Sequence, residues 1–361
     1  MWWLLWSTGA LAAPLDPGAF TSLGASLTCT STITVDTDTQ ELTVDGATTY
    51  TGVVSGGVAV FTFDDIDLPA SCTVSALAGR SLPLALLSKG DLSVAGTIEA
   101  SASGDLGGAG GHGVASGPGA GSSVLDFGWF CGGGGHGGNG GGTVATRGLA
   151  YGDLLTELTG GSGGGVANMP GFGGGGGAVE LGAAGQLSIL STAVVVANGG
   201  NANPANTGNS CVGGGGGGGI VVHGTSGAVE GVLRARGGNG DNTTQERAGG
   251  GGRIAVIGLT TTLATLDVTR GTYTVGGYKG SDGVVVLDAD GDGSPASEDC
   301  DDEDPTVYPG APDTCDGVDT DCDGLDNGTP DSDGDGSCDS SDLCPGHDDL
   351  VDTDGDTVPD G

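Results

Sequence analysis

Aromatic side chains, positive charges and long apolar runs are all scarce in this sequence. Phe, Trp and Tyr make up 4% of the 361 residues, which argues against one large conventional core. Only 9 residues are Lys or Arg, so a nucleic-acid-binding module is not expected. No segment reaches the roughly 18 unbroken apolar residues that cross a bilayer, and we therefore expect no transmembrane span.

The sequence motifs of several enzyme classes are also missing. Glycine runs are frequent, but no GxxxxGK[ST] motif accompanies them, which excludes a phosphate-binding loop of that type. His112, His136 and His223 lie in or beside glycine runs without HExxH or His-x-His spacing, so we assign them no metal. The remaining catalytic candidates are Glu180, Glu230, Arg234, Arg236 and Arg253. Glu180 and Glu230 stand in different registers of their repeats, so nothing forces them together, and we expect no enzyme.

Glycine is the most conspicuous residue that the sequence does contain. The chain has 81 glycines, and because glycine brings no side chain to bury, a stable fold must repeat backbone hydrogen bonds many times. Residues 26–99 alternate Thr and Val in short stretches, the pattern of β-strands. From about Leu92 to Ile257, glycine runs lead into pairs of short apolar strands; the best copies begin at Gly173 and Gly213, and a third opens at Gly249.

This repeat predicts an all-β chain folded as a parallel β-helix, or solenoid. Each unit has too little apolar surface to fold alone, and stacking it on the next unit buries its strands. The glycine runs would be surface excursions, either extended segments of polyproline-II type or disordered loops. A low-complexity linker at 103–180 is the alternative for that stretch.

The beginning of the chain predicts export. A short apolar run ends in Ala10-Leu11-Ala12, a small-x-small site typical of cleavage after Ala12. No Lys or Arg precedes the run, so an ordinary apolar N-terminal strand is the alternative. In an exported chain, cysteines predict disulfides whose connectivity cannot be read from sequence. The nine cysteines are Cys29, Cys72, Cys131, Cys211, Cys300, Cys315, Cys322, Cys338 and Cys344.

The last fifth of the chain holds most of the negative charge. The net charge is −37, and residues 288–361 contain 26 Asp and Glu with no Lys or Arg. Such a segment repels nucleic acid and attracts multivalent cations. Calcium takes about six to eight oxygen ligands, which a loop with carboxylates at positions 1, 3, 5 and 12 and a glycine at position 6 supplies. Copies of this spacing begin at Asp288, Asp331 and Asp352, and the third copy ends inside its repeat, as it would in a fragment.

Two family resemblances follow from these residues. The stretch from Asp299 to Gly324, with Tyr308-Pro309-Gly310-Ala311 at its centre, closely resembles the MopE-type metal-binding motif of bacterial surface proteins. Thr320 stands where that motif has Asn. Residues 331–345 and the stretch after 352 look like thrombospondin type 3 calcium repeats. Both resemblances imply that aspartates bind metal at the cell surface.

The acidic tail is therefore predicted to be irregular and stabilised by calcium. Copper, after which the MopE-type motif is named, favours imidazole or thiolate, whereas this tail offers one histidine and cysteines at disulfide-like spacing. The predicted boundaries are 1–12 for the signal peptide, 13–90 for the first part of the solenoid, 91–286 for the glycine-rich solenoid, 287–329 for the MopE-type motif and 330–361 for the thrombospondin type 3-like repeats. The predicted metal ligands are Asp288, Asp290, Asp292, Asp299, Asp301, Asp302, Asp304, Asp316, Asp319, Asp321, Asp323, Asp331, Asp333, Asp335, Asp339, Asp342, Asp352, Asp354, Asp356 and Asp360.

Two functions fit this sequence. The first is a secreted or cell-surface structural or adhesion protein that binds calcium and whose acidic tail is a calcium-ordered spacer. The second is a secreted β-helix that binds or degrades glycans and carries the same tail. Besides calcium ions, the expected partners are surface glycans or other surface proteins.

Overall fold

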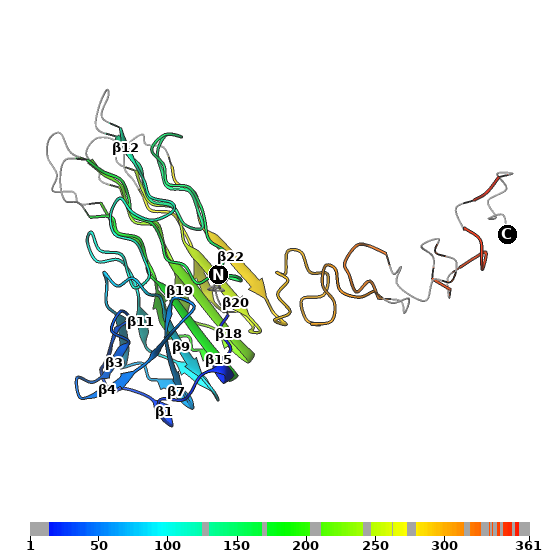
Figure 1. The fold of residues 1–361 in the computed structure, drawn as a ribbon, viewed down its shortest axis with the longest axis horizontal. Helices are drawn as coiled ribbons and strands as arrows, with labels where there is room; N and C mark the ends of the chain where they lie inside the picture. The colour runs from blue at the N-terminus through cyan, green and yellow to red at the C-terminus, as the bar shows by residue number, and fades with distance from the viewer. Residues whose placement is uncertain are drawn as a thin grey trace, which may run out of the picture. The chain divides into compact units, whose positions relative to one another are not determined.

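The computed structural model divides the chain into two compact units, Met1–Val286 and Leu287–Gly361 (Figure 1). It describes residues 14–124, 130–167, 172–202, 211–240, 247–261, 263–272, 279–313, 318–325, 332, 334, 338–339, 342–348 and 351–353. Within these residues the regular secondary structure is almost entirely strand, with one short 3₁₀ helix, η1, at Pro17–Ala19. None of the described helices is long and apolar enough to cross a membrane. The prediction of an all-β chain is confirmed.

The first unit contains two large sheets. The ten-stranded sheet has the order β1-β7-β10-β15-β18-β20-β22, with β5, β6 and β9 attached beside this path. Its strands are β1 Ser26–Leu27, β5 Val53–Ser55, β6 Val58–Phe63, β7 Asp65–Leu68, β9 Leu84–Ser88, β10 Leu92–Val94, β15 Ala178–Ile189, β18 Gly219–Val229, β20 Arg253–Ile257 and β22 Val284–Asp288.

The eight-stranded sheet has the order β21-β19-β16-β11-β8-β2-β3-β4. Its strands are β2 Thr32–Asp36, β3 Glu41–Val44, β4 Thr48–Thr51, β8 Thr73–Ala76, β11 Thr97–Glu99, β16 Val194–Val196, β19 Val232–Arg234 and β21 Thr265–Asp267. Two small antiparallel pairs complete the described strands: β12 Ser123–Val124 with β13 Phe130–Cys131, and β14 Val166–Ala167 with β17 Cys211–Val212.

Successive strands alternate between the two large sheets. The pairs β7 and β8, β10 and β11, β15 and β16, and β18 and β19 each add one strand to each sheet, in parallel register. In the eight-stranded sheet, Val74, Ile98, Val195 and Leu233 stand in line on neighbouring strands and are all 0% exposed. Each of these apolar side chains is therefore packed against its counterparts on the neighbouring strands, which keeps the row out of water.

The sheets are mixed, which differs from the purely parallel arrangement that we predicted. β2, β3 and β4 pair antiparallel, and so do β5 and β6. The connections explain the difference, because these strands are joined by turns too short for a parallel crossover. Asp45 and Gly46 occupy one such turn with positive φ angles.

The described glycine runs are buried, so the prediction that they are surface excursions is wrong. They contain few strands, and their N–H groups bond to carbonyls of other runs, as Gly134 does to Gly214 and Gly250 to Gly134, both at 2.9 Å. A Cβ atom on Gly215 would collide with the carbonyl oxygen of Gly174. Because glycine lacks that atom, the backbones approach closely and satisfy one another's polar groups without side chains.

Two disulfides tie distant parts of the first unit together. Cys29 bonds to Cys72, which immediately precedes β8, and Cys131 of β13 bonds to Cys211 of β17. All four residues are at most 4% exposed. These pairings could not be derived from the spacing of the cysteines.

Candidate metal centre

The first acidic loop begins at Asp288, the last residue of β22. The side chain of Asp288 is 1% exposed. Its Oδ1 atom accepts from the N–H of Gly291 at 2.7 Å, and its Oδ2 atom accepts from the N–H of Gly293 at 3.1 Å. Gly293 has a φ of +100°, a conformation that side chains disfavour, so glycine is required at this sixth position. Asp288 thus folds the loop back on itself.

Three further aspartates of this loop each use one carboxylate oxygen in the same way. The Oδ1 atom of Asp290 accepts from the N–H of Asp292 at 3.2 Å, and that of Asp292 accepts from the N–H of Ser294 at 2.7 Å. The Oδ1 atom of Asp299 accepts from the N–H of Asp301 at 2.9 Å. Each bond spans two residues, so the local backbone fixes the orientation of each carboxylate.

The second oxygen of each of these three carboxylates is buried without a hydrogen-bond partner among the described residues. These atoms are Oδ2 of Asp290, of Asp292 and of Asp299. The three side chains offer ligand oxygens that all lie within 4.8 Å of one another. Buried acceptors without donors are costly, and like charges this close repel. A cation among them would remove both costs.

A second group shares Asp290 with the first. Asp288, Asp290 and Asp302 also offer oxygens within 4.8 Å of one another. Oδ1 of Asp302 accepts from the N–H of Ala289 at 2.8 Å, which holds this later residue against the start of the loop. Five carboxylates, those of Asp288, Asp290, Asp292, Asp299 and Asp302, therefore form one cluster, which we call the first cluster.

The crowding and burial of these carboxylates raise the pKa of two of them. The pKa of Asp288 is raised to about 6, mainly by burial and also by the nearby charges of Asp292 and Asp290, although the N–H groups of Gly291 and Gly293 act to lower it. Burial also raises the pKa of Asp290, together with repulsion from Asp292, Asp299 and Asp302. Both carboxyls are thus harder to ionise than an exposed aspartate, and a nearby positive charge would favour their ionised form.

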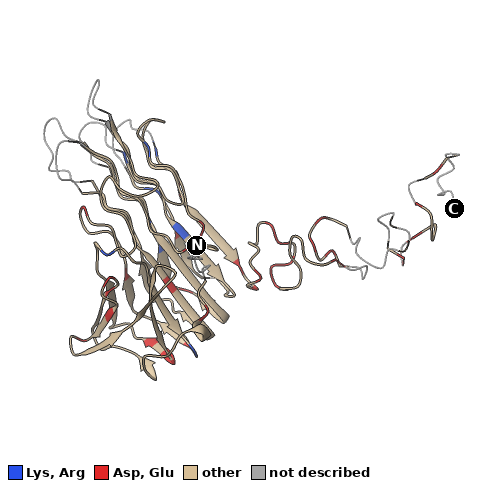
Figure 2. Cartoon of the chain, viewed as in Figure 1, with Lys and Arg blue, Asp and Glu red and all other residues tan. Residues whose placement is uncertain are grey.

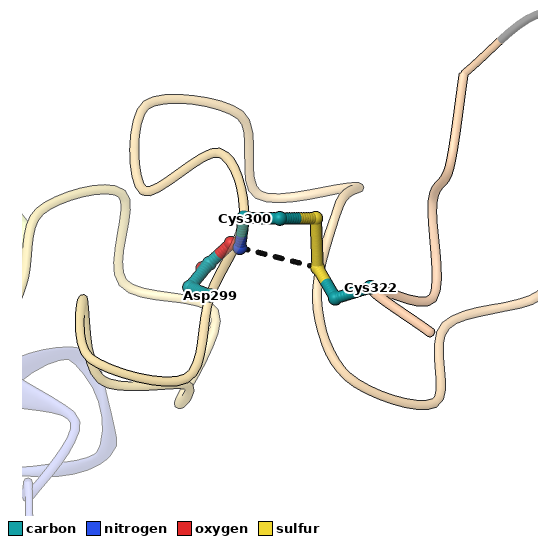
Figure 3. A group of neighbouring side chains, drawn as sticks. All are labelled: Asp299, Cys300 and Cys322. Carbon is teal, nitrogen blue, oxygen red and sulfur yellow. Dashed lines mark hydrogen bonds between the residues drawn. A yellow bond between two sulfur atoms is a disulfide. The ribbon is translucent and has the colours of Figure 1, made fainter. Parts of the chain in front are cut away.

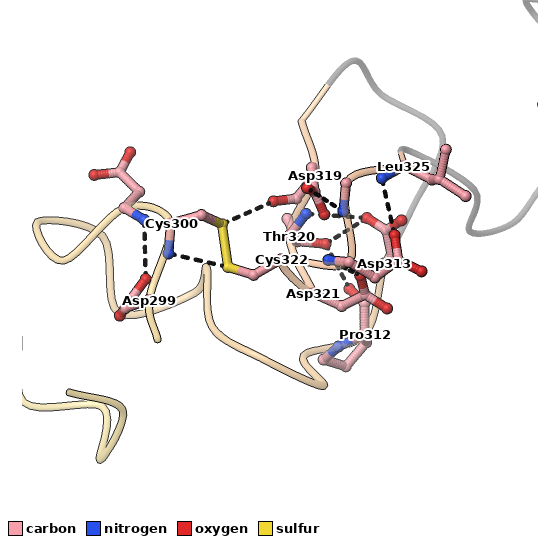
Figure 4. Close-up of a disulfide and its surroundings, with 12 residues drawn as sticks. Asp299, Cys300, Pro312, Asp313, Asp319, Thr320, Asp321, Cys322 and Leu325 are labelled. Atoms are coloured by element: carbon pink, nitrogen blue, oxygen red, sulfur yellow. Dashed lines mark hydrogen bonds between the residues drawn. A yellow bond between two sulfur atoms is a disulfide. The ribbon is translucent and has the colours of Figure 1, made fainter. Parts of the chain in front are cut away.

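Residues 319–324 repeat the geometry of the first loop (Figure 4). Oδ2 of Asp319 accepts from the N–H of Gly324 at 2.9 Å, as Asp288 does from Gly293. Oδ1 of Asp321 accepts from the N–H of Asp323 at 3.1 Å, and Oδ1 of Asp323 accepts from the N–H of Leu325 at 2.8 Å. Gly324 has a φ of +94°.

The carboxylates of this second loop also gather around one point. Asp319, Asp321 and Asp323 offer oxygens within 4.8 Å of one another, and we call them the second cluster. Oδ1 of Asp319 is buried without a hydrogen-bond partner among the described residues. All three residues were predicted as ligands from the sequence, but the loop of the first type was not. The signal was present in the spacing Asp319-x-Asp321-x-Asp323-Gly324.

A disulfide joins the segments that carry the two clusters. Cys300 follows Asp299, Cys322 lies within the second loop, and their sulfurs are bonded (Figure 3). The N–H of Cys300 also donates to Sγ of Cys322 at 3.1 Å. Asp299, Cys300 and Cys322 lie close enough to act as three ligands. However, the disulfide leaves no thiolate at either cysteine, and we interpret this group as a cross-link rather than a metal site.

Thr320, which replaces the usual Asn of the motif, has a clear structural role. Its Oγ1 donates to Oδ1 of Asp313 at 2.6 Å, and its N–H donates to the same oxygen at 3.2 Å (Figure 4). The hydroxyl also lies 3.2 Å from the carbonyl of Pro312. Thr320 thereby holds the second loop against residues 312–313.

Five of the predicted ligands that the structure describes fall in neither cluster: Asp301, Asp304, Asp339, Asp342 and Asp352. Asp304 accepts from the N–H and the Oγ1 of Thr306 at 3.0 and 2.7 Å, bonds that lower its pKa. Asp339 accepts from the N–H and the Oγ of Ser332 at 2.6 and 2.7 Å. The remaining predicted ligands lie outside the described residues: Asp316, Asp331, Asp333, Asp335, Asp354, Asp356 and Asp360.

Comparison with known proteins bears on the second unit alone. Residues 299–327 match a metal-binding family model. The model is that of the Cu-binding MopE type, described as "Putative metal-binding motif". The matched segment begins at Asp299 of the first cluster and contains the whole second cluster. No curated protein and no solved structure matches the chain.

The two acidic candidates of the first unit, Glu180 and Glu230, differ in burial and in their contacts. Glu180 is 0% exposed, and its Oε1 accepts from the N–H of Leu15 at 2.6 Å and lies 2.9 Å from Nε2 of His223. Glu230 is exposed, whereas Glu180 is buried, so the two acids do not share an environment. The strand register explains the contact with His223, because Gly182, two residues beyond Glu180, pairs with His223.

His136, Arg253 and the other basic candidates also have defined partners. Nδ1 of His136 lies 3.1 Å from the carbonyls of both Gly217 and Gly218, and its Nε2 lies 3.0 Å from Oγ1 of Thr159. Burial lowers the pKa of His136 to about 3, so its ring is neutral and Nδ1 donates to the glycine carbonyls. The Nε atom of Arg253 donates to the carbonyl of Tyr151 at 3.0 Å. Arg234 and Arg236 both pair with Asp267.

Proposed function

We propose that this chain is a secreted or cell-surface protein with a structural or adhesive role, in which residues 287–361 bind calcium and act as a calcium-ordered spacer. The observation that carries the proposal is the set of three buried, unpartnered oxygens on Asp290, Asp292 and Asp299. The same three side chains each offer a carboxylate oxygen within 4.8 Å of the others. A cation is the ligand that satisfies them.

The donor set favours calcium over copper. Both clusters consist of carboxylate oxygens, which suit a hard cation, and calcium accommodates the irregular geometry of loop ligands. Copper favours thiolate and imidazole. The disulfide removes Cys300 and Cys322 as thiolates, and His347 is the single histidine of residues 287–361.

The spacer role rests on the distribution of charge and of apolar residues. Figure 2 shows Asp and Glu along the second unit, where the sequence contains no Lys or Arg. Without cations, mutual repulsion extends such a segment, and few buried apolar residues oppose it: Val307, Ala311 and Cys338 are the described ones. Ordering is therefore coupled to metal binding. We extend the same role to the thrombospondin type 3-like repeats after residue 330.

The first unit is proposed to be a β-solenoid without enzymatic activity. The alternation of strands between two sheets supports the solenoid, and the burial of Glu180 beneath Leu15 supports a structural role for that acid. Export, with cleavage after Ala12, accords with three disulfides, which persist in oxidising compartments.

Isothermal titration of the full chain tests the proposal. Protein stripped with EDTA and desalted is titrated with Ca²⁺ at pH 7, and a parallel titration uses Cu²⁺. We expect saturable calcium binding at roughly 10⁻⁴–10⁻³ M, the range of extracellular calcium modules. Absence of saturable heat up to millimolar calcium, or copper binding that calcium does not displace, would overturn the calcium assignment.

A further inference from the structure

Positive charge, scarce in this chain, gathers at one place in the first unit. Arg236, Arg270 and Lys279 line a hollow of about 550 Å³ that also includes Asn239 and Thr272. The whole chain has only 9 Lys and Arg, so three of them in one hollow is a concentration that its composition does not predict. We call this the basic hollow.

The local carboxylates only partly neutralise these charges. Asp267 pairs with two guanidinium groups, those of Arg234 at 3.3 Å and Arg236 at 2.5 Å. Asp282 pairs with Arg270 at 3.1 Å. Lys279 is exposed and takes part in none of the ion pairs found among the described residues. Among the described residues, these four cations and two carboxylates leave an excess of positive charge in a protein that is otherwise strongly acidic.

Two hydrogen bonds connect residues of the basic hollow with residues of a second hollow. The N–H of Arg236 donates to Oδ1 of Asn198 at 2.9 Å, and the N–H of Asn239 donates to Oδ1 of Asn201 at 2.8 Å. Asn198 and Asn201 line this second hollow, of about 390 Å³, together with Phe172. These two hydrogen bonds join residues that line the two hollows, and we call the two hollows together the groove.

The groove combines three kinds of group. Phe172 is 45% exposed, in a chain where aromatic residues are rare. Oδ1 of Asn198 and of Asn201 is occupied by backbone N–H groups, which leaves the amide NH₂ groups as donors to a ligand. The guanidinium and ammonium groups at the other end are donors that match carboxylate or sulfate oxygens.

We propose that this groove binds an acidic polysaccharide, a chain of sugars that carry carboxylates. A sugar ring has a C–H face that packs on an aromatic ring and a rim of hydroxyls that accept from amides, and its carboxylate pairs with Arg or Lys. An acidic peptide would satisfy the charges but would not use the Phe172 ring. The binding is separate from calcium binding, since every residue of the groove belongs to the first unit.

Affinity electrophoresis of the full chain tests the proposal. The gels contain polygalacturonate, neutral dextran or polyaspartate, with EDTA present so that calcium cannot bridge the acidic tail to the polymer. We expect retardation by polygalacturonate alone, weakened by added salt. Lys279→Gln should reduce the affinity about fivefold, the upper limit for one exposed charge pair. Phe172→Ala should reduce it by a similar factor of about five through lost ring contact.

Lys89→Gln is the matched control, because Lys89 is exposed, carries the same charge and lies outside the groove. It should bind polygalacturonate as the unaltered chain does. Equal losses in Lys89→Gln and Lys279→Gln would show attraction without a site and overturn the proposal. Equal retardation by polyaspartate, insensitive to Phe172→Ala, would identify an acidic peptide as the ligand and overturn it too. Absence of retardation by polygalacturonate would do the same, and none of these results would affect the calcium titration.

Discussion

Asp290 and Asp299 are nine residues apart in the sequence, and their carboxylates meet in one cluster with oxygens within 4.8 Å. In each carboxylate, Oδ1 accepts a hydrogen bond from a nearby N–H, and Oδ2 is buried without a partner among the described residues. This relationship distinguishes the first cluster from a merely acidic surface. Its consequences can be measured through charge, pH and cross-linking.

Removing one charge from the first cluster should weaken calcium binding and relieve repulsion. Asp292→Asn keeps the shape of the side chain but lacks the negative charge. We expect at least about a tenfold loss of calcium affinity, since one unpaired buried charge costs several kcal/mol. In EDTA the variant should resist proteolysis of the second unit better than the unaltered chain.

Asp304→Asn is the control for that change. Asp304 is exposed and lies in neither cluster, so its replacement should leave calcium affinity unchanged. If titration shows the same loss in both variants, the acidic segment attracts calcium diffusely and the first cluster is not a site.

Calcium binding should release a proton between pH 4 and pH 7. The pKa of Asp288 is raised from 3.8 to about 6, so the folded chain holds this proton more tightly than the unfolded chain does. In EDTA, stability is therefore greatest below pH 4 for this group and falls as the pH rises through 6. Calcium reverses the trend because it requires the ionised carboxylate.

Titration at pH 5.5 in two buffers of different ionisation enthalpy measures this proton release. The released proton should appear as a difference in heat between the buffers, and Asp288→Asn should reduce that difference. Identical heats in both buffers would contradict the assignment of Asp288 as a ligand.

The Cys300–Cys322 disulfide should preorganise the segments that carry the two clusters. Cys300 and Cys322 are 22 residues apart, and closing a loop of that size stabilises a fold by about 3 kcal/mol. Replacing both with serine should raise the calcium concentration needed to protect the second unit from proteolysis. Because this unit has no Lys or Arg for trypsin, a protease such as Glu-C is used. Unchanged protection at every calcium concentration would show that the cross-link does not preorganise the clusters.

The glycine runs should not tolerate even one methyl group. Gly215→Ala places a Cβ against the carbonyl oxygen of Gly174, and overpacking of this kind costs about 3 kcal/mol. We expect a clear fall in the thermal midpoint of the first unit. Gly113→Ala is the control, because its Cβ would meet nothing closer than 3.4 Å. Equal midpoints for the two variants would contradict the tight packing.

Acid should destabilise the first unit through His136. Burial holds the pKa of His136 near 3, below its ordinary 6.5, so the folded chain keeps the ring neutral while the unfolded chain takes up a proton. Its contribution to stability is complete above pH 6.5 and is lost as the pH falls from 6.5 toward 3. His136→Asn, which retains a donor for the glycine carbonyls, should show a smaller fall in thermal midpoint between pH 7 and pH 4. An equal fall in both proteins would assign the acid sensitivity to other groups.

The local chemistry of the acidic loops was determined by the sequence itself. Alternate aspartates followed by Gly293 specify a loop because each bond spans two to five residues, a distance that the nearby backbone controls. The all-β character was equally local, since alternating Thr and Val suit strands. The same reasoning missed the loop at 319–324 only because the three aspartates were assigned through the longer motif.

Tertiary structure alone decided which segments meet. Neither the pairing of Cys29 with Cys72 nor the contact of Glu180 with His223 follows from spacing, because strand register across the sheet brings them together. The burial of the glycine runs was also decided there. A run without side chains carries no apolar pattern to read, and its position depends on backbone hydrogen bonds to other runs far away in the chain.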